Sequence, residues 1–383
     1  MTTPPRILTI AGSDSSGGAG VQADIKTITM LGGYAMTAIT AVTAQNTLGV
    51  QAVEVLPPDL VAAQIDSCVS DIGVDAVKIG MLGSAEIAHL VADKLEGLAV
   101  PVVFDPVMVA TSGAALADSA TIEAFERLMT LAALTTPNVH ELAALGGDAA
   151  MARRAIAYLA KGGDAAGDMI EDRLEVPGLA PVVWQSARVV TRHTHGTGCT
   201  LASAIATFLG MGLDLTTAAA RGREFVNLSL RDAPGFGAGH GPLGHAAIRL
   251  DLTGEPRFNQ LTLPAQDYAA SCAFYRALGL QQIVDSPDNG YARFECGGGA
   301  TLSIARDHGI SGGAAAYFEC FDLDTVLQGL AANGITSSPP IEQTWLWRES
   351  WLTDPAGNRL CFYEAGINRR FPPWALTRGM LQR

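Results

Sequence analysis

The stretch ILTIAGSDSSGGAGVQADIKT, residues 7–27, decides the fold of the first half of the chain. It opens with an apolar run at 7–12, which predicts a buried strand, and then passes through a loop rich in serine and glycine. Val21, Ile25 and Ile28 follow at helical spacing, which predicts an amphipathic helix. A strand, a glycine loop and a helix in this order are typical of an α/β protein, in which ligand sites gather beyond the carboxyl ends of the strands.

Similar units recur as far as residue 250. Apolar runs predict further strands at 37–44, 76–81, 100–106 and 188–194. The continuous apolar character of several of these runs indicates burial on both faces, as in a parallel sheet covered by helices. Leu201, Ile205 and Phe208 again show helical spacing. We therefore expect residues 1–250 to form one α/β domain with a layered parallel sheet and helices on both faces.

The pattern of the chain changes after a segment rich in glycine and proline at 234–245. We expect a strand at 258–264, a helix at 268–279 and strands near 280–285, 290–296 and 300–306. The same order returns with a strand at 314–321, a helix at 322–334 and strands near 335, 345–352 and 359–364. Two βαβββ units in tandem predict a smaller α+β domain over 256–366, followed by a tail at 367–383.

Composition limits the classes of function. The chain has 383 residues, of which 48% are hydrophobic and only 16% charged, which is enough for two packed cores. Its net charge of −13 argues against binding to nucleic acid or to anionic membranes. No apolar run approaches the roughly 20 residues that span a bilayer, and the first residues lack the layout of a signal peptide. Six scattered cysteines without a CxxC pair favour reduced thiols, so we expect a cytoplasmic protein.

The run Gly196-Thr197-Gly198-Cys199 has the features of an anion site. Glycines allow successive backbone amides to turn inward, and the helix that we expect to start near Thr200 aims its positive end at the same place. A helix start also lowers the pKa of a thiol, so Cys199 would suit a base or nucleophile beside a phosphate. The alternative is a plain glycine turn with an inert cysteine. His193 and His195 would face the same side of an extended stretch, where polar packing is their simplest role.

Seven motifs in one order give a specific resemblance. They are IAGSDSSGGAGVQADIKT (10–27), TAQNT (43–47), KIGML (78–82), DPVMVATSG (105–113), TPNVHE (136–141), KGG (161–163) and HTHGTGCT (193–200). The chain resembles, over residues 5–250, the hydroxymethylpyrimidine/phosphomethylpyrimidine kinases, which are thiamine-pathway members of the ribokinase-like family. The resemblance implies a ribokinase-like fold, ATP and Mg²⁺ as cofactors, and phosphorylation of hydroxymethylpyrimidine and then of its monophosphate. The partners would be small molecules, and a homo-oligomer stays open.

The resemblance also implies roles for individual residues. Cys199 stands at the catalytic position, where we expect a base for the hydroxymethyl oxygen, and the implied anion hole comprises Gly196, Thr197, Gly198 and Cys199. Asp105 and Glu141 are the expected metal ligands, because carboxylates at strand ends suit magnesium held largely through water. Lys161 and Thr197 would meet the nucleotide. The implied pyrimidine contacts are Gly12, Asp24, Gln45 and Met81.

Two departures from the family pattern keep alternatives open. Asp164 follows the KGG motif where the family usually has histidine, and only 22 residues lie between Asn138 and Lys161, where the family usually has a longer stretch. One alternative is a pyridoxal or pyridoxamine kinase, and another is a pyrimidine-binding sensor without catalysis. The run at 18–23 fits the dinucleotide pattern GxGxxA, but no acid for a ribose follows it, and no P-loop motif occurs.

The second half resembles the glyoxalase/bleomycin-resistance (vicinal oxygen chelate) family over residues 256–366. Family enzymes bind a divalent metal with His and Glu or Gln at fixed strand positions. The equivalent positions here hold Gln260, Ala315 and Cys361, so we expect a binding domain without a metal. Trp345, Trp347 and Trp351 alternate along one expected strand and would share a face, either around a ligand or in a core or interface.

Overall fold

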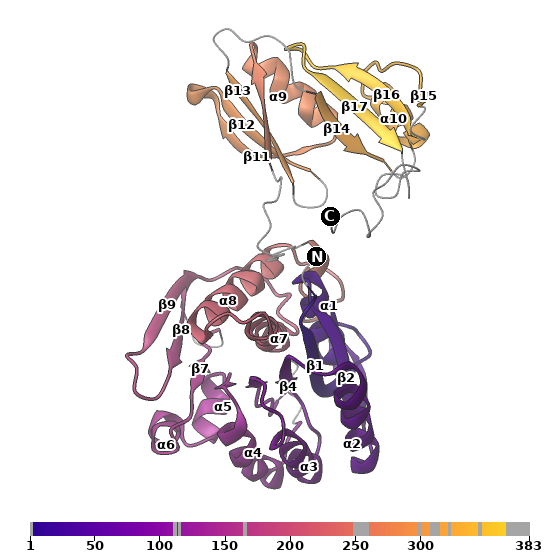
Figure 1. The fold of residues 1–383 in the computed structure, drawn as a ribbon. Helices are drawn as coiled ribbons and strands as arrows, with labels where there is room; N and C mark the ends of the chain where they lie inside the picture. The colour runs from indigo at the N-terminus through magenta and orange to yellow at the C-terminus, as the bar shows by residue number, and fades with distance from the viewer. Residues whose placement is uncertain are drawn as a thin grey trace, which may run out of the picture. The chain divides into compact units, whose positions relative to one another are not determined.

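The computed structural model describes residues 3–109, 113, 116–163, 167–247, 260–296, 300–306, 315–320, 323–343 and 347–364. Asp164, Trp345 and the tail at 367–383 lie outside these residues. The chain divides into two compact units, residues 1–255 and residues 256–383 (Figure 1).

The first unit is built on one sheet of nine strands in the order β3-β2-β1-β4-β5-β6-β7-β8-β9. The strands are β1 (Arg6–Asp14), β2 (Tyr34–Asn46), β3 (Gly49–Val55), β4 (Ala76–Ile79), β5 (Val102–Phe104), β6 (Leu134–Thr135), β7 (Tyr158–Ala160), β8 (Met169–Glu175) and β9 (Val182–Ala187). The six strands from β2 to β7 in this order pair in parallel. The strands β3, β8 and β9 pair antiparallel at the edges.

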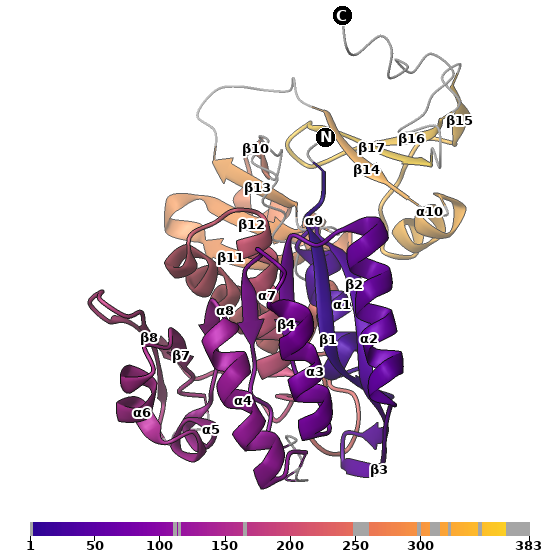
Figure 2. The ribbon, with the colours of Figure 1, turned by 60° about the horizontal axis from the view of Figure 1, so that its bottom comes forward.

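Helices cover both faces of this sheet (Figures 1 and 2). One face carries α2 (Pro58–Ser67), α3 (Ala85–Leu95) and α4 (Ser119–Leu131), and the other carries α1 (Gly20–Met30), α7 (Thr197–Gly210) and α8 (Leu215–Arg231). The short helices α5 (Val139–Ala144) and α6 (Gly147–Arg153) follow β6. Successive residues of a strand point to opposite faces, so Val102 and Phe104 join the core under α3 and α4, while Val103 joins the core under α7 and α8.

This arrangement confirms the predicted α/β fold with helices on both faces, while the edges of the sheet are antiparallel. The strand predicted at 188–194 is wrong, because β9 ends at Ala187 and Val190 is 97% exposed. Its β-branched residues favour an extended backbone, but no strand of the described part of the chain pairs with residues 188–194, and the only bridge nearby joins His195 to Pro242. The short stretch between Asn138 and Lys161 forms α5, α6 and β7, and β7 extends the parallel part of the sheet beyond β6.

The second unit contains the two predicted βαβββ repeats. The first repeat forms the sheet β10-β13-β12-β11, and the second forms the sheet β14-β17-β16-β15. The strands are β10 (Gln260–Ala265), β11 (Gln281–Ser286), β12 (Tyr291–Glu295), β13 (Thr301–Arg306), β14 (Ala315–Glu319), β15 (Ile341–Glu342), β16 (Arg348–Thr353) and β17 (Arg359–Glu364), and the helices are α9 (Tyr268–Ala277) and α10 (Leu323–Ala332). The strand predicted near 335 is wrong. It is replaced by β15, which begins directly after Pro339 and Pro340, residues that cannot donate to a ladder.

In the part of the chain that the structure describes, no helix combines the length and the apolar character that a bilayer crossing requires.

Candidate active site

Two glycine loops meet at backbone contact and form the centre of the site. One loop joins β1 to α1, and the other precedes α7, whose N-cap is Gly196 with φ 88°. A Cβ on Gly196 would lie 1.9 Å from the Gly18 carbonyl oxygen, and a Cβ on Gly18 would lie 2.4 Å from Cδ2 of His195. Gly196 also has a backbone conformation that other residues rarely adopt. The close approach of the two loops therefore requires glycine on each side.

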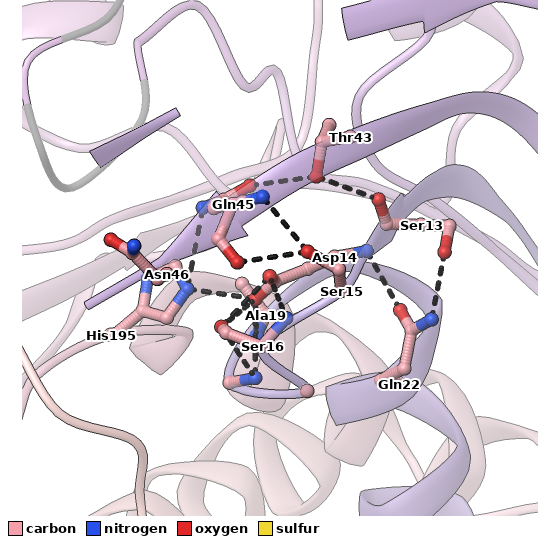
Figure 3. A network of polar contacts seen from close by, with 12 residues as sticks. Ser13, Asp14, Ser15, Ser16, Ala19, Gln22, Thr43, Gln45, Asn46 and His195 are labelled. Carbon is pink, nitrogen blue, oxygen red and sulfur yellow. Dashed lines mark hydrogen bonds and ion pairs between the residues drawn. The ribbon is translucent and has the colours of Figure 1, made fainter. Parts of the chain in front are cut away.

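Asp14 organises the first loop (Figure 3). Its carboxylate accepts hydrogen bonds from the backbone N–H groups of Ser16 and Ala19, both at 2.8 Å, and of Gly18 at 3.1 Å. Nε2 of His195 lies 2.8 Å from Oδ2 of Asp14. Burial works against the charge of Asp14, but the hydrogen bonds from His195, Ser16 and Ala19 outweigh it and hold the pKa of this carboxyl below its usual value.

Cys199 lies in the first turn of α7 and is half-buried. Among the described residues, no acceptor lies within hydrogen-bond distance of the N–H groups of Gly198 and Cys199, so both amides are available to an anion. The backbone N–H of Gly20 favours the thiolate form. Burial nevertheless raises the pKa of this thiol to about 11, against the opposing effect of the nearby Lys78 ammonium. The pKa of Cys199 is therefore above its usual value, and not below it as expected of a thiol at a helix start.

Asp24 lies beneath this surface in a buried ion pair. Its two carboxylate oxygens lie 3.0 and 2.9 Å from Nζ of Lys78, and neither side chain has any exposed area. The hydroxyls of Thr9 and Ser203 also donate to Asp24. The pyrimidine contact expected of Asp24 does not agree with this burial, because the carboxylate has no exposed atom to offer a ligand. Asp24 instead joins α1, β4 and α7.

Lys78 is a site residue that the sequence reasoning did not single out. It lies on β4 with all four residues of the strand buried. Burial opposes its charge, but Asp24, Cys199 and Asp105 outweigh that effect and raise the pKa of Lys78. The signal in the sequence was a lone lysine inside the apolar run AVKIGM, because a buried lysine requires a partner.

Asp105, Lys161 and Glu141 come together on the other side of the α7 start. Nζ of Lys161 lies 2.8 Å from Oδ1 of Asp105 and 3.7 Å from Oε2 of Glu141. A Cβ on Gly198 would lie 3.2 Å from Oδ2 of Asp105 and 3.3 Å from Nζ of Lys161, so the three side chains lie against the free amides. The site thus joins the predicted metal and nucleotide residues with the predicted anion hole.

The three side chains of this cluster shift one another's pKa. Burial and the neighbouring Asp105 raise the pKa of Glu141, although Lys161 and the N–H groups of Asn138 and Met108 oppose the rise. Burial disfavours the ammonium of Lys161, but Asp105 and Glu141 outweigh it and raise the pKa of Lys161. Lys161 therefore remains charged, as a phosphate-binding residue must.

The two carboxylates fit a hydrated magnesium ion. Oδ1 of Asp105 accepts from Thr136 and Lys161, while Oδ2 faces Gly198 and has no hydrogen-bond partner among the described residues. Glu141 caps α5, with Oε2 2.8 Å from the Asn138 N–H. No group of three or more His, Cys, Asp or Glu that could hold a metal occurs among the described residues. These oxygens would suit an ion that takes its other ligands from water and phosphate.

Three of the expected pyrimidine contacts surround the first loop. A Cβ on Gly12 would lie 3.1 Å from the sulfur of Met81, so β1 and the residues after β4 are in contact here. Nε2 of Gln45, at the end of β2, lies 3.4 Å from Nε2 of His195. Gln45 and Met81 are half-buried, so both retain surface for a ligand.

Thr197 was expected in the anion hole, but its backbone N–H is used within the loop. It donates to the Thr194 carbonyl at 3.3 Å.

The second unit has an aromatic cluster around Cys361, one of the positions that correspond to metal ligands in family enzymes. Cys361 has no exposed area and packs with Tyr363, Trp347 and Trp351. Trp347 stacks on Tyr363 with ring centroids 4.5 Å apart, and the Arg359 guanidinium lies 4.2 Å from the Trp351 centroid. The side chains of Gln260 and Ala315 are outside the described part of the structure, as is Trp345.

Comparison with known families gives two matches. Residues 14–244 match the family described as phosphomethylpyrimidine kinase, and residues 257–362 match the glyoxalase/bleomycin resistance protein/dioxygenase superfamily. A hydroxymethylpyrimidine/phosphomethylpyrimidine kinase of Streptomyces coelicolor is 45% identical over 257 residues, which cover 63% of this chain and 95% of the relative. The thiamine biosynthesis bifunctional protein ThiED of Geobacter sulfurreducens is 46% identical over 262 residues, which cover 64% of this chain and 53% of that longer protein.

Solved structures confirm the ribokinase-like fold of the first unit. The pyridoxal kinase of Bacillus subtilis, solved with ADP, has a TM-score of 0.58 and a sequence identity of 32%. The match covers 65% of this chain and 100% of that kinase. The pyridoxal kinase of Staphylococcus aureus, solved with AMP-PCP and pyridoxal, has the same TM-score of 0.58 and 30% identity, covering 65% of this chain and 96% of that kinase.

The buried pair of Lys78 and Asp24 can be tested by removing one charge. Lys78→Met should lower the free energy of unfolding of the first unit by about 3–5 kcal/mol, because it leaves Asp24 buried and unpaired. Lys94→Met is the control, because Lys94 and its partner Asp66 are both partly exposed, and the loss should stay below about 1 kcal/mol.

The measurement is urea unfolding of the full chain, followed by hydrogen-exchange mass spectrometry of peptides from residues 1–255. Equal losses in the Lys78 and Lys94 variants would contradict the assigned role of the buried pair.

Proposed function

Because the chain belongs to the phosphomethylpyrimidine kinase family, we propose that it transfers the γ-phosphoryl group of ATP to hydroxymethylpyrimidine and then to the resulting monophosphate. The diphosphate made in this way is a precursor in thiamine diphosphate biosynthesis. We also propose that the second unit, which matches the glyoxalase/bleomycin resistance protein/dioxygenase superfamily, binds a ligand without a catalytic metal. The six cysteines form no disulfide, which fits a reducing compartment, so we place the activity in the cytoplasm.

One observation carries the proposal. The first turn of α7 presents the N–H groups of Gly198 and Cys199, with the Cys199 thiol on the same turn and the charged side chains of Lys161 and Asp105 against Gly198. Phosphoryl transfer requires stabilised negative charge, an oriented nucleophile and a base for its proton, and this turn offers donors for the charge and a thiol as the base.

Cys199, Gly198 and Lys78 have different roles in the proposed transfer. The Cys199 thiolate accepts the proton of the substrate hydroxymethyl group, whose oxygen forms a bond to the γ-phosphorus while the bond to the bridging oxygen of ADP breaks. The amides of Gly198 and Cys199 stabilise the equatorial oxygens. Lys78, buried below Cys199, favours the thiolate form.

The nucleotide side relies on Lys161, Asp105 and Glu141. Lys161 would donate to the ATP phosphates, and Asp105 and Glu141 would hold Mg²⁺ through water. When bound, the metal would neutralise charge on the phosphates. On the substrate side, Gln45 and Met81 present an amide and an apolar surface that match the polar edge and the face of an aminopyrimidine.

The direct test gives the purified full-length protein ATP, Mg²⁺ and either hydroxymethylpyrimidine or pyridoxal, with products identified by mass spectrometry. We expect the pyrimidine to be converted to its monophosphate and diphosphate with the higher kcat/KM, in line with relatives of 45% identity. Preference for pyridoxal would identify a pyridoxal kinase instead, and binding of the pyrimidine without ATP turnover would identify a sensor.

Replacement of the base should abolish most of the activity. Cys199→Ala should lower kcat by roughly 10²–10⁴-fold, the usual contribution of a general base, with little change in KM for ATP. Cys68→Ala, at a half-buried thiol next to α2, should leave kcat unchanged. A Cys199→Ala variant with near-normal kcat would show that another group takes the proton.

The raised pKa of Cys199 predicts how the rate depends on pH. A base acts in its deprotonated form, and with a pKa of about 11 only a small fraction of Cys199 is thiolate at neutral pH. The kcat/KM for the pyrimidine should therefore rise about tenfold per pH unit between about pH 7.5 and 9.5. Cys199→Ala should lose this rise, and a flat profile in the unmodified protein would contradict the assignment of the base.

The metal requirement tests the two carboxylates. Asp105→Asn and Glu141→Gln should each raise the Mg²⁺ concentration for half-maximal rate by about tenfold, the usual effect of weakening a metal site. Glu126→Gln is the control, because Glu126 lies on the surface of α4 in a pair with Arg154. An unchanged Mg²⁺ dependence in both site variants would place the metal elsewhere.

A further inference from the structure

A buried pair of His195 and Asp14 joins the two glycine loops, and the transfer described above uses neither residue. His195 is 5% exposed and Asp14 is 3% exposed. Nε2 of His195 lies 2.8 Å from Oδ2 of Asp14 (Figure 3). The two residues lie far apart in the sequence, so this contact fixes one loop against the other.

On the Asp14 side, the pair controls the shape of the first loop. The carboxylate gathers the N–H groups of Ser16, Gly18 and Ala19, so the backbone wraps around one acceptor. Gly18 and Ala19, inside this wrapped segment, meet the start of α7: a Cβ on Gly196 would lie 1.9 Å from the Gly18 carbonyl oxygen and 3.2 Å from Cα of Ala19. The position of the first turn of α7 therefore depends on the loop that Asp14 holds.

On the other side of the pair, His195 contacts three parts of the site. The imidazole ring packs against Gly18 so closely that no side chain fits there. The backbone N–H of His195 donates to the Gly241 carbonyl at 3.1 Å, and Nε2 of the ring lies 3.4 Å from the amide nitrogen of Gln45. His195 also directly precedes Gly196, the N-cap of the helix that carries Cys199.

We propose that His195 is a positioning residue. Its Nε2–H donates to the Asp14 carboxylate and locks the β1–α1 loop against the start of α7, which fixes the first turn of α7 with the Cys199 thiol and the N–H groups of Gly198 and Cys199. Amide N–H groups at a helix start favour the thiolate over the thiol, so the lock increases the population of the reactive form. The catalytic part of this inference rests on the proposed kinase function, whereas the effect on the thiol does not.

The test compares His195→Leu with His195→Gln in the full-length protein. Leucine removes the donor, whereas the glutamine amide can place an N–H near the position of the imidazole Nε2. One readout is the rate at which iodoacetamide alkylates Cys199 without substrates at one fixed pH, followed by mass spectrometry of its peptide. The other readouts are kcat and the KM for ATP.

We expect His195→Leu to slow the alkylation of Cys199 by at least about threefold, because a lower thiolate population reacts more slowly. It should lower kcat by at least about tenfold while the KM for ATP stays within about twofold, because misplacement of reacting groups reduces turnover rather than nucleotide binding. His195→Gln should recover most of both losses. His240→Leu, at an exposed histidine of the neighbouring loop, should match the unmodified protein.

Unchanged or faster alkylation of Cys199 in His195→Leu, or equal losses in the leucine and glutamine variants, would overturn the proposal. Hydrogen exchange that is faster throughout residues 1–255 than in the unmodified protein would reveal a variant whose first unit has lost its fold. In that case His195→Asn replaces the leucine variant, because its shorter amide does not extend to the Nε2 position. If the unmodified protein proves inactive as a kinase, the alkylation rates still decide the role of His195.

Discussion

The backbone contact between Gly18 and Gly196 is the constraint on which the rest of the site depends. A Cβ added at Gly196 would lie 1.9 Å from the Gly18 carbonyl oxygen, and a Cβ added at Gly18 would lie 2.4 Å from Cδ2 of His195, so this contact requires glycine at both positions. The contact places the end of β1 beside the first turn of α7, which carries Cys199. Two segments 178 positions apart, at Gly18 and Gly196, thus form one site.

Two groups of buried charged residues lie next to this contact. The pair of Lys78 and Asp24 joins β4, α1 and α7 under the thiol, and the cluster of Lys161, Asp105 and Glu141 lies against Gly198. An acidic protein can therefore bind a polyanionic nucleotide, because the local donors and cations, rather than the net charge of −13, determine the potential at the site. The high pKa of the thiol results mainly from its burial.

Strong periodic signals could be read from the sequence, whereas contacts between distant segments could not. The glycine loops, the apolar strands and the tandem βαβββ repeats predicted the fold, because each depends on local pattern. The strand expected at 188–194 failed, since β-branched residues cannot show whether a neighbouring strand exists. Asp24 was expected at the ligand, and only the folded chain reveals that it pairs with Lys78, 54 positions away. The partnership of His195 with Asp14 was hidden for the same reason.

The central claim is that the two glycine loops build one phosphoryl-transfer site, and a crystal structure of the full-length protein with hydroxymethylpyrimidine, Mg²⁺ and a non-hydrolysable ATP analogue tests it most directly. The account predicts the hydroxymethyl oxygen within hydrogen-bond distance of the Cys199 sulfur and terminal phosphate oxygens on the N–H groups of Gly198 and Cys199. A pyrimidine whose hydroxymethyl group points away from Cys199, or a terminal phosphate bound away from the start of α7, would contradict it.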